Sequence, residues 1–199
     1  MKKLFNFKII VLIVAVSTIQ YTFGQDYKKN IKSDFIKFND LINNRQFEKS
    51  TEYMLPEFFE LVSKSQLISL MKQIFNNPDF EILVEKPNSI TIDDSRKINN
   101  KFYSLISYSY DMKMKYKNKS DSDDKQMQEL LLKSFEKTFG KENVNFNSVT
   151  NYYSIHQNKN AYAISNNGTD SWKFIEIDKQ QKVLLEKLLP QEIIKDFFK

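Results

Sequence analysis

The fold of this chain is decided by residues 102–116, which read FYSLISYSYDMKMKY. The even positions are almost all aromatic or aliphatic, whereas the odd positions beyond Leu105 carry Ser, Asp or Lys. Because successive side chains of a strand point to opposite faces, this alternation predicts a long antiparallel strand with one buried face and one face toward water. Ser107, Ser109 and Asp111 are expected on the water face. A strand of this length must twist or bend to stay on a compact core.

The chain before this strand has a helical pattern. Apolar residues at helical spacing predict an amphipathic helix over residues 28–43. A second helix is expected over 47–54, and a short one begins near Pro56. A capping box at Ser63 opens a further helix that is expected to stop at Asn76.

The rest of the chain predicts more strands and three more helical stretches. The strands are short runs rich in β-branched and aromatic residues, at 80–84, 89–92, 144–153, 160–165 and 171–177. Polar turns are expected at 157–159 and 166–168. A helix is expected over 123–139, ending at Gly140, and two short helices close the chain. We therefore expect one α+β domain over residues 25–199, with N-terminal helices packed on a curved, mostly antiparallel sheet.

The N-terminal segment predicts export. Three lysines, an apolar run at 9–16 and small residues at Thr22 and Gly24 give residues 1–24 the layout of a secretory signal peptide. The apolar run is shorter than the ~20 residues that a membrane-spanning helix needs, so no stable membrane span is expected after cleavage. A buried N-terminal helix is the alternative. We expect a periplasmic or extracellular location.

Composition excludes several functions. Three lysines of the +5 net charge lie in residues 1–24, so the remaining 175 residues carry +2, and no nucleic-acid partner is expected. The absence of cysteine excludes disulfides, thiolate nucleophiles, Cys-ligated metals and lipid attachment at a cysteine. A single histidine, His156, cannot supply a His-rich metal site or a Ser-His-Asp triad with suitable spacing. Asp121, Asp123 and Asp124 do not fit an EF-hand loop and are better explained as a helix start. We expect no metal and no cofactor.

Several stretches carry a resemblance to a known group of proteins. They are MLPEFFELV at 54–62, YSYDMKM at 108–114, AYAI at 161–164, WKFIEI at 172–177 and LEKLLP at 185–190. In this order the chain resembles small exported bacterial proteins of unknown function with the cone-shaped fold of nuclear transport factor 2. The resemblance spans roughly residues 30–195. It implies a pocket between the concave sheet and the long helices, in a fold that hosts isomerases, dehydratases and plain binding modules.

That pocket defines the candidate site. The ligand-binding candidates are large side chains expected on one face of the sheet: Tyr108, Tyr110, Met112, Met114, Tyr116, Trp172 and Phe174. Glu176 alternates in phase with Trp172 and Phe174, so its carboxylate is the first candidate for proton transfer, and His156 is the second. A filled core is the alternative explanation of the aromatic stripe.

Three functions remain open at this point. The first is an exported binding module that takes an unknown small apolar molecule, or a protein partner, in a Tyr/Met-lined pocket or on a sheet face. The second is a small isomerase- or dehydratase-like enzyme that uses Glu176 and His156. The third is a structural homodimer subunit.

Overall fold

Two long antiparallel strands form the centre of the sheet in the computed structural model, which describes residues 26–117 and 124–198. They are β4 (Lys101–Tyr116) and β6 (Tyr152–Ser165). They pair without interruption from Phe102 opposite Ser165 to Met114 opposite Tyr153. The predicted signal peptide at residues 1–24 lies outside the described residues. No described helix is long and apolar enough to cross a membrane.

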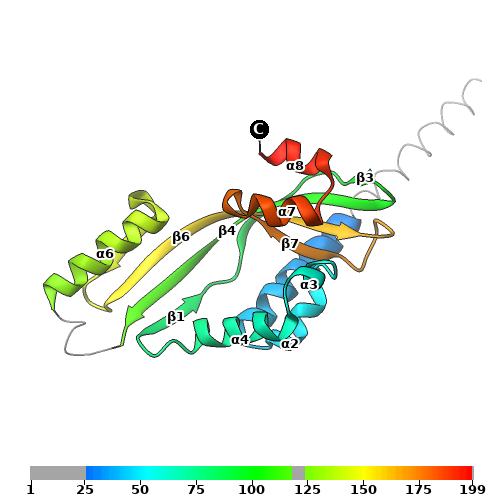
Figure 1. Ribbon diagram of the computed structural model, residues 1–199. Coiled ribbons are helices and arrows are strands. Elements are labelled where there is room, and N and C mark those ends of the chain that lie inside the picture. The colour runs from blue at the N-terminus through cyan, green and yellow to red at the C-terminus, as the bar shows by residue number, and fades with distance from the viewer. Residues whose placement is uncertain (1–25, 118–123, 199) are drawn as a thin grey trace, which may run out of the picture.

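Five shorter strands complete the sheet, and every one of them runs antiparallel to its neighbour (Figure 1). Three strands pair one after another with the edge of β4 that faces away from β6: β1 (Phe80–Val84), β2 (Asn88–Ile92) and β3 (Arg96–Ile98). Two pair along the free edge of β6: β5 (Val144–Asn147) and β7 (Lys173–Ile177). The predicted α+β class with an antiparallel sheet is confirmed.

The predicted helices are present, with caps that the sequence indicated. The first spans residues 26–43. The other predicted helical segments correspond to α2 (Phe47–Ser50), η1 (Thr51–Tyr53), α3 (Phe58–Leu61), α4 (Lys64–Phe75), α6 (Lys125–Phe139), α7 (Lys182–Leu188) and α8 (Gln191–Phe197). Two short 3₁₀ helices that the sequence did not predict are η2 (Lys141–Asn143) and η3 (Lys179–Gln181). Ser63 caps α4, and the side chain of Asp124 accepts a hydrogen bond at the start of α6. Gly140 ends α6 at a φ of 91°, a conformation that favours glycine.

The first hydrophobic cluster lies between the helix at 26–43 and one face of the sheet. Ile31 and Phe35 of that helix pack against Ile106 and Tyr108 of β4 and Phe174 of β7. The rings of Phe35 and Phe174 meet edge to face, with centroids 5.3 Å apart. This cluster confirms that Tyr108 lies beneath an N-terminal helix.

A second cluster covers the opposite face of the same strands, which corrects one prediction. Tyr103 of β4 and Tyr162 of β6 pack against Leu185 of α7 and Ile193 of α8. Tyr103 is therefore only 6% exposed, although it belongs to the face that the alternation assigned to water. The reason is that the C-terminal helices fold back over this end of the sheet (Figure 1), and strand periodicity carries no information about such a cover.

The predicted turn at residues 157–159 is wrong. These residues continue β6, with Asn158 and Lys159 opposite Ser109 and Tyr108. The chain turns earlier, between β5 and β6. There the Asn147 side chain accepts hydrogen bonds from the next backbone amides, and Asn151 adopts a positive φ of 58°. Because β4 offers backbone partners along its whole length, polar side chains do not interrupt β6.

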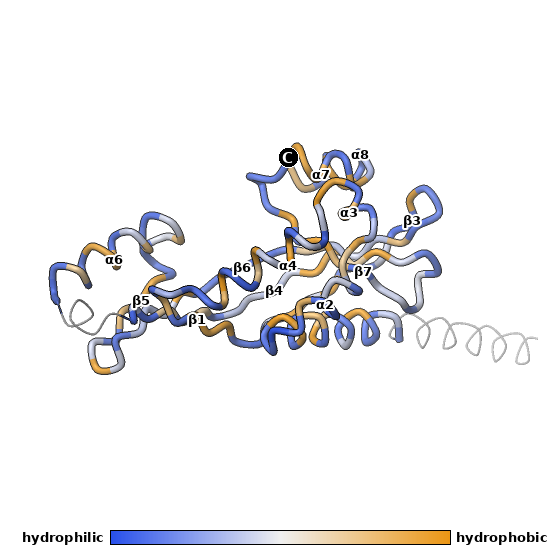
Figure 2. Tube along the Cα trace, turned by 60° about the horizontal axis from the view of Figure 1, so that its bottom comes forward, coloured by the Kyte–Doolittle hydropathy of each residue, from blue (hydrophilic) through white to orange (hydrophobic). Residues whose placement is uncertain are grey.

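The outer half of the sheet has a small aromatic cluster of its own beneath α6. Phe135 of α6 packs edge to face on Tyr153, at 5.0 Å between centroids, and also contacts Phe80 of β1. Hydrophobic residues recur between hydrophilic ones along α6 (Figure 2), and α6 lies far from α7 and α8 (Figure 1). The two ends of the sheet are thus covered by different helices.

Candidate functional site

A mostly apolar cavity of about 250 Å³ lies between the helix at 26–43 and the sheet, next to the start of α7. Aromatic and aliphatic side chains line it from six parts of the chain: Phe35, Phe38, Ile42, Met54, Phe58, Tyr108, Ala161, Phe174, Ile175 and Leu184. The polar members of the lining are Asn39, Glu176 and Gln181. A concave, apolar site with a few polar groups is the usual form of a small-molecule site.

The Glu176 carboxylate is held by two partners from neighbouring strands. Its Oε2 accepts a hydrogen bond from the Tyr108 hydroxyl at 3.2 Å, and its Oε1 lies 3.1 Å from the Lys159 ammonium. Lys159 also lies 3.6 Å from a carboxylate oxygen of Asp178. The strand register explains this meeting, because Tyr108 faces Lys159 across β4 and β6 while Glu176 faces Ala161 across β6 and β7.

The surroundings raise the pKa values of Tyr108, Tyr110 and Lys159. Burial and the nearby Glu176 carboxylate raise the pKa of Tyr108 far above its ordinary value, and the same two causes raise the pKa of Tyr110. Burial disfavours the charged form of Lys159, but Glu176 outweighs burial and holds the pKa of Lys159 above its ordinary value. Tyr108 therefore keeps the proton that it donates to Glu176, and Lys159 acts as a cation.

Four of the predicted site residues gather at this cavity. Tyr108 and Phe174 line it. Tyr110 stacks on Tyr108 with ring centroids 6.2 Å apart. Glu176 reaches the cavity from β7 with 48% of its side chain exposed, so it lies at the mouth and not in the interior.

The remaining ligand-binding candidates lie elsewhere. Trp172 is 1% exposed and belongs to the core, where its Nε1 donates to the carbonyl of Thr169. Met112, Met114 and Tyr116 lie farther along β4, in the outer half of the sheet, and are not part of the cavity lining. The ring of Tyr116 instead contacts Phe80, which joins it to the cluster beneath α6.

His156 and Glu176 are not brought together. His156 faces Asp111 across β4 and β6, with 2.9 Å between its Nδ1 and the Asp111 carboxylate. Odd-numbered residues of β4 and even-numbered residues of β6 share one face, whereas Tyr108 and Glu176 lie on the other. A joint acid–base role for these two residues has no support in this geometry.

Sequence reasoning missed the lysine and much of the cavity wall. The polar run at 157–159 predicts a turn at Lys159, although Lys159 alternates in phase with Ala161 and Ala163, and that phase places it on the cavity face. Phe35 and Phe38 belong to the apolar stripe of the helix at 26–43, and such a stripe predicts a buried face without indicating a cavity.

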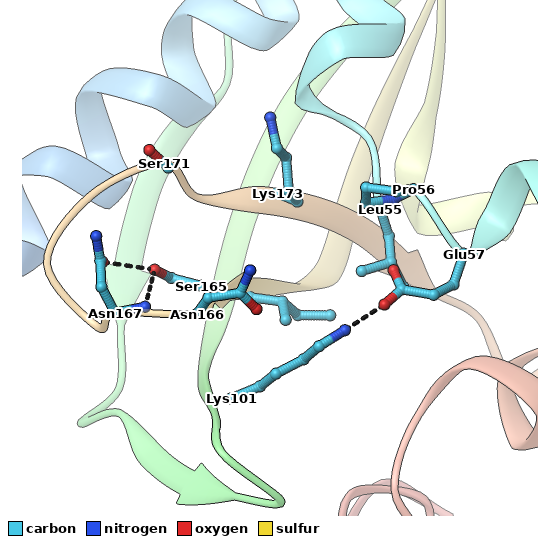
Figure 3. Close-up of a pocket in the computed structure, with 10 residues that line it drawn as sticks. Leu55, Pro56, Glu57, Lys101, Ser165, Asn166, Asn167, Ser171 and Lys173 are labelled. Carbon is cyan, nitrogen blue, oxygen red and sulfur yellow. Dashed lines mark hydrogen bonds and ion pairs between the residues drawn. The ribbon is translucent and has the colours of Figure 1, made fainter.

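A second cavity, of about 340 Å³, opens on the other side of β7 (Figure 3). Leu55, Glu57 and Lys101 line it together with the loop that follows Ile164. Its polar groups largely satisfy one another, since Lys101 pairs with Glu57 and the Ser165 hydroxyl accepts hydrogen bonds from backbone amides of its own loop. Glu57 Oε2 is buried and has no hydrogen-bond partner among the described residues.

The described part of the chain contains no group of three or more His, Asp or Glu residues that could hold a metal ion. Comparison of the chain with protein-family models, with curated proteins and with solved structures gave no match.

Proposed function

We propose that this protein is an exported binding module that takes a small apolar molecule into the cavity beside Tyr108 and Glu176. The observation that carries the proposal is the cavity itself, an apolar volume lined by five aromatic rings with the Glu176 carboxylate at its mouth. Its volume of about 250 Å³ lies just below the usual range of ligand pockets, ~300–1,000 Å³, so the occupant is a molecule of modest size.

Two further parts of the proposal concern the fold family and the location. A cone fold of the nuclear transport factor 2 type is supported by a long helix lying across β4 and β6 with a cavity between them. Export to the periplasm or the outside is supported by the signal-like pattern of residues 1–24.

A rim substitution tests the binding function. Leu184 lines the cavity and is half-buried, so Leu184→Trp should obstruct the volume without overfilling the core. Val183→Trp adds the same indole one residue earlier, at a position that is 72% exposed. Heptanol is the probe, titrated into nitrogen-15-labelled protein. We expect shifts at cavity residues in the wild type and in the Val183 variant, with binding weakened by about tenfold or more in the Leu184 variant. Equal affinities in both variants, or no binding by the wild type, would contradict the proposal.

A proton-transfer enzyme is the second candidate, and the contact between Tyr108 and Glu176 favours it. In this alternative Glu176 acts without His156, because the two lie on opposite faces of the sheet. Loss of turnover in Glu176→Gln, together with unchanged turnover in His156→Ala, would support the enzyme. The reaction would be assayed on whatever molecule co-purifies with the protein.

A homodimer subunit is the third candidate. Leu70 and Ile74 of α4 and Leu130 of α6 are exposed apolar side chains, of the kind that subunit contacts cover. Sedimentation equilibrium at micromolar concentration tests it. A dimer that persists on dilution, combined with no heptanol binding, would put this candidate first.

A further inference from the structure

Negatively charged groups outnumber positively charged groups at the cavity mouth. Glu176 is the one charged residue among the described side chains that line the cavity. Behind it, Lys159 lies 3.1 Å from Glu176 and 3.6 Å from Asp178, so a single cation is shared by two carboxylates. The three groups together carry a charge of −1.

The carboxylate of Glu176 retains capacity to accept hydrogen bonds. Two carboxylate oxygens offer about four acceptor positions. The Tyr108 hydroxyl occupies one position on Oε2, and the Lys159 ammonium occupies one on Oε1. Since about half of the side chain is exposed, a donor that enters from the cavity can reach the remaining positions.

The apolar lining of the cavity consists largely of aromatic rings. Phe174 packs against Phe35 and Phe38, with ring centroids 5.3 and 5.8 Å apart, and all three rings line the cavity that Glu176 borders. Aromatic faces pack well against alkyl chains and also attract cations. An anion gains nothing from these rings and meets the surplus carboxylate at the mouth.

We propose, on the basis of the binding function above, that the site selects apolar molecules that carry a protonated amine over those that carry a carboxylate. The hydrocarbon part occupies the cavity between Phe35, Phe174 and Leu184, and the ammonium donates to Glu176. A bound ammonium brings the charge of the mouth to zero, whereas a bound carboxylate brings it to −2. Lys159 is already held by Glu176 and Asp178 and is a poor partner for an incoming anion.

Three probes with the same seven-carbon chain test the preference. They are heptylamine, heptanol and octanoate, titrated into wild-type protein near neutral pH at low salt. We expect heptylamine to bind about tenfold more tightly than octanoate, with heptanol between them, because partly exposed charges at a pocket mouth contribute on this scale. The ratio should fall when salt is added.

Glu176→Gln identifies the residue responsible. It should remove most of the difference between heptylamine and octanoate, and binding of the uncharged heptanol shows that the variant is folded. Glu186→Gln is the matched control, because Glu186 lies on α7 and pairs with Lys182 outside the cavity lining. It should leave the ratio unchanged.

The outcomes separate this inference from the proposed function. Equal affinities for all three probes, or tighter binding of octanoate, would overturn the amine preference and leave the binding function standing. Failure of every probe, heptanol included, would overturn the binding function itself.

Discussion

The Tyr108 hydroxyl of β4 donates to Glu176 of β7 at 3.2 Å, although strand β6 lies between them. The residue of β6 opposite Glu176 is Ala161, whose side chain is a single methyl group. Because this side chain is so short, the tyrosine can reach across the middle strand. The small side chain of Ala161 thus allows a hydrogen bond between Tyr108, in the core beneath the helix at 26–43, and Glu176 at the mouth of the cavity.

Two substitutions separate packing from hydrogen bonding at Tyr108. Tyr108→Ala should lower the free energy of unfolding by about 3–5 kcal/mol, as loss of a buried aromatic side chain does. Tyr108→Phe keeps the ring against Phe35 and should cost only about 0.5–1.5 kcal/mol. Urea titrations measure both values. Similar losses in the two variants would mean that the hydroxyl, and not the ring, stabilises this region.

Ser109 is expected to matter more than its place on the polar face suggests. Its side chain is hydrogen-bonded to the Asn88 side chain, and the residue is only 4% exposed. Ser109→Ala should therefore cost about 1 kcal/mol, whereas an ordinary surface change stays within about 0.5 kcal/mol. Ser154→Ala, on the same face of the outer half, is the comparison. A loss at position 109 no larger than at position 154 would contradict the importance of this bond.

Lys101 should make stability depend on pH through Glu57. Burial alone would raise the pKa of Glu57, but Lys101 outweighs burial and holds it below its ordinary value of 4.5. A carboxyl whose pKa is lower when folded adds stability above the unfolded value, and this stability is lost as pH falls through the folded value. In Lys101→Met the effect of burial on the Glu57 carboxylate is no longer offset by Lys101, so the free energy of unfolding at pH 7 should fall by about 1 kcal/mol. The effect is modest because both side chains are about a third exposed.

Thermal unfolding at several pH values measures this effect. The difference between wild type and Lys101→Met should shrink as the pH falls through the two folded-state pKa values of Glu57, above 4.5 in the variant and below 4.5 in the wild type. Lys72→Met breaks the exposed pair with Glu48 and should change stability less. A difference that stays constant down to pH 2 would show that Lys101 acts through packing alone.

Phe135 should stabilise the outer half of the sheet selectively. Its ring packs against Tyr153 and Phe80, and the Tyr153 hydroxyl also donates to the Gln128 carbonyl of α6. In Phe135→Ala we expect faster hydrogen exchange at the amides of β1 and β5, with little change around Ile106 and Ala163 in the inner core. Faster exchange throughout the sheet would mean that the two ends unfold as one unit.

The sequence predicts an element correctly where the apolar face of its pattern is also the face that the structure buries. The alternation over 102–116 and the helical spacing over 28–43 predicted the central strand and the helix that covers it, because each pattern reports one apolar face. It failed at 157–159, where three polar residues resemble a turn but continue a strand whose partner is already present. Local composition cannot show that a distant strand supplies those hydrogen bonds.

Alternation along the strands also predicts part of the candidate site, namely the residues whose face it fixes. Glu176 and Tyr108 were placed on one face by their phase, and they meet in the structure. His156 was chosen for its chemistry, without a register to place it, and it lies on the opposite face beside Asp111. Lys159 could be found only once β6 was known to run unbroken past it.

The unbroken pairing of β4 with β6 has a mechanical consequence. Tyr108 and Lys159 form a rung near the middle of this two-strand beam, with α6 attached at one end and α8 near the other. Because the ladder has no break, a shift of the backbone at this rung also distorts the backbone hydrogen bonds on either side of it. The residues beside the cavity are therefore held in place from both ends of the sheet.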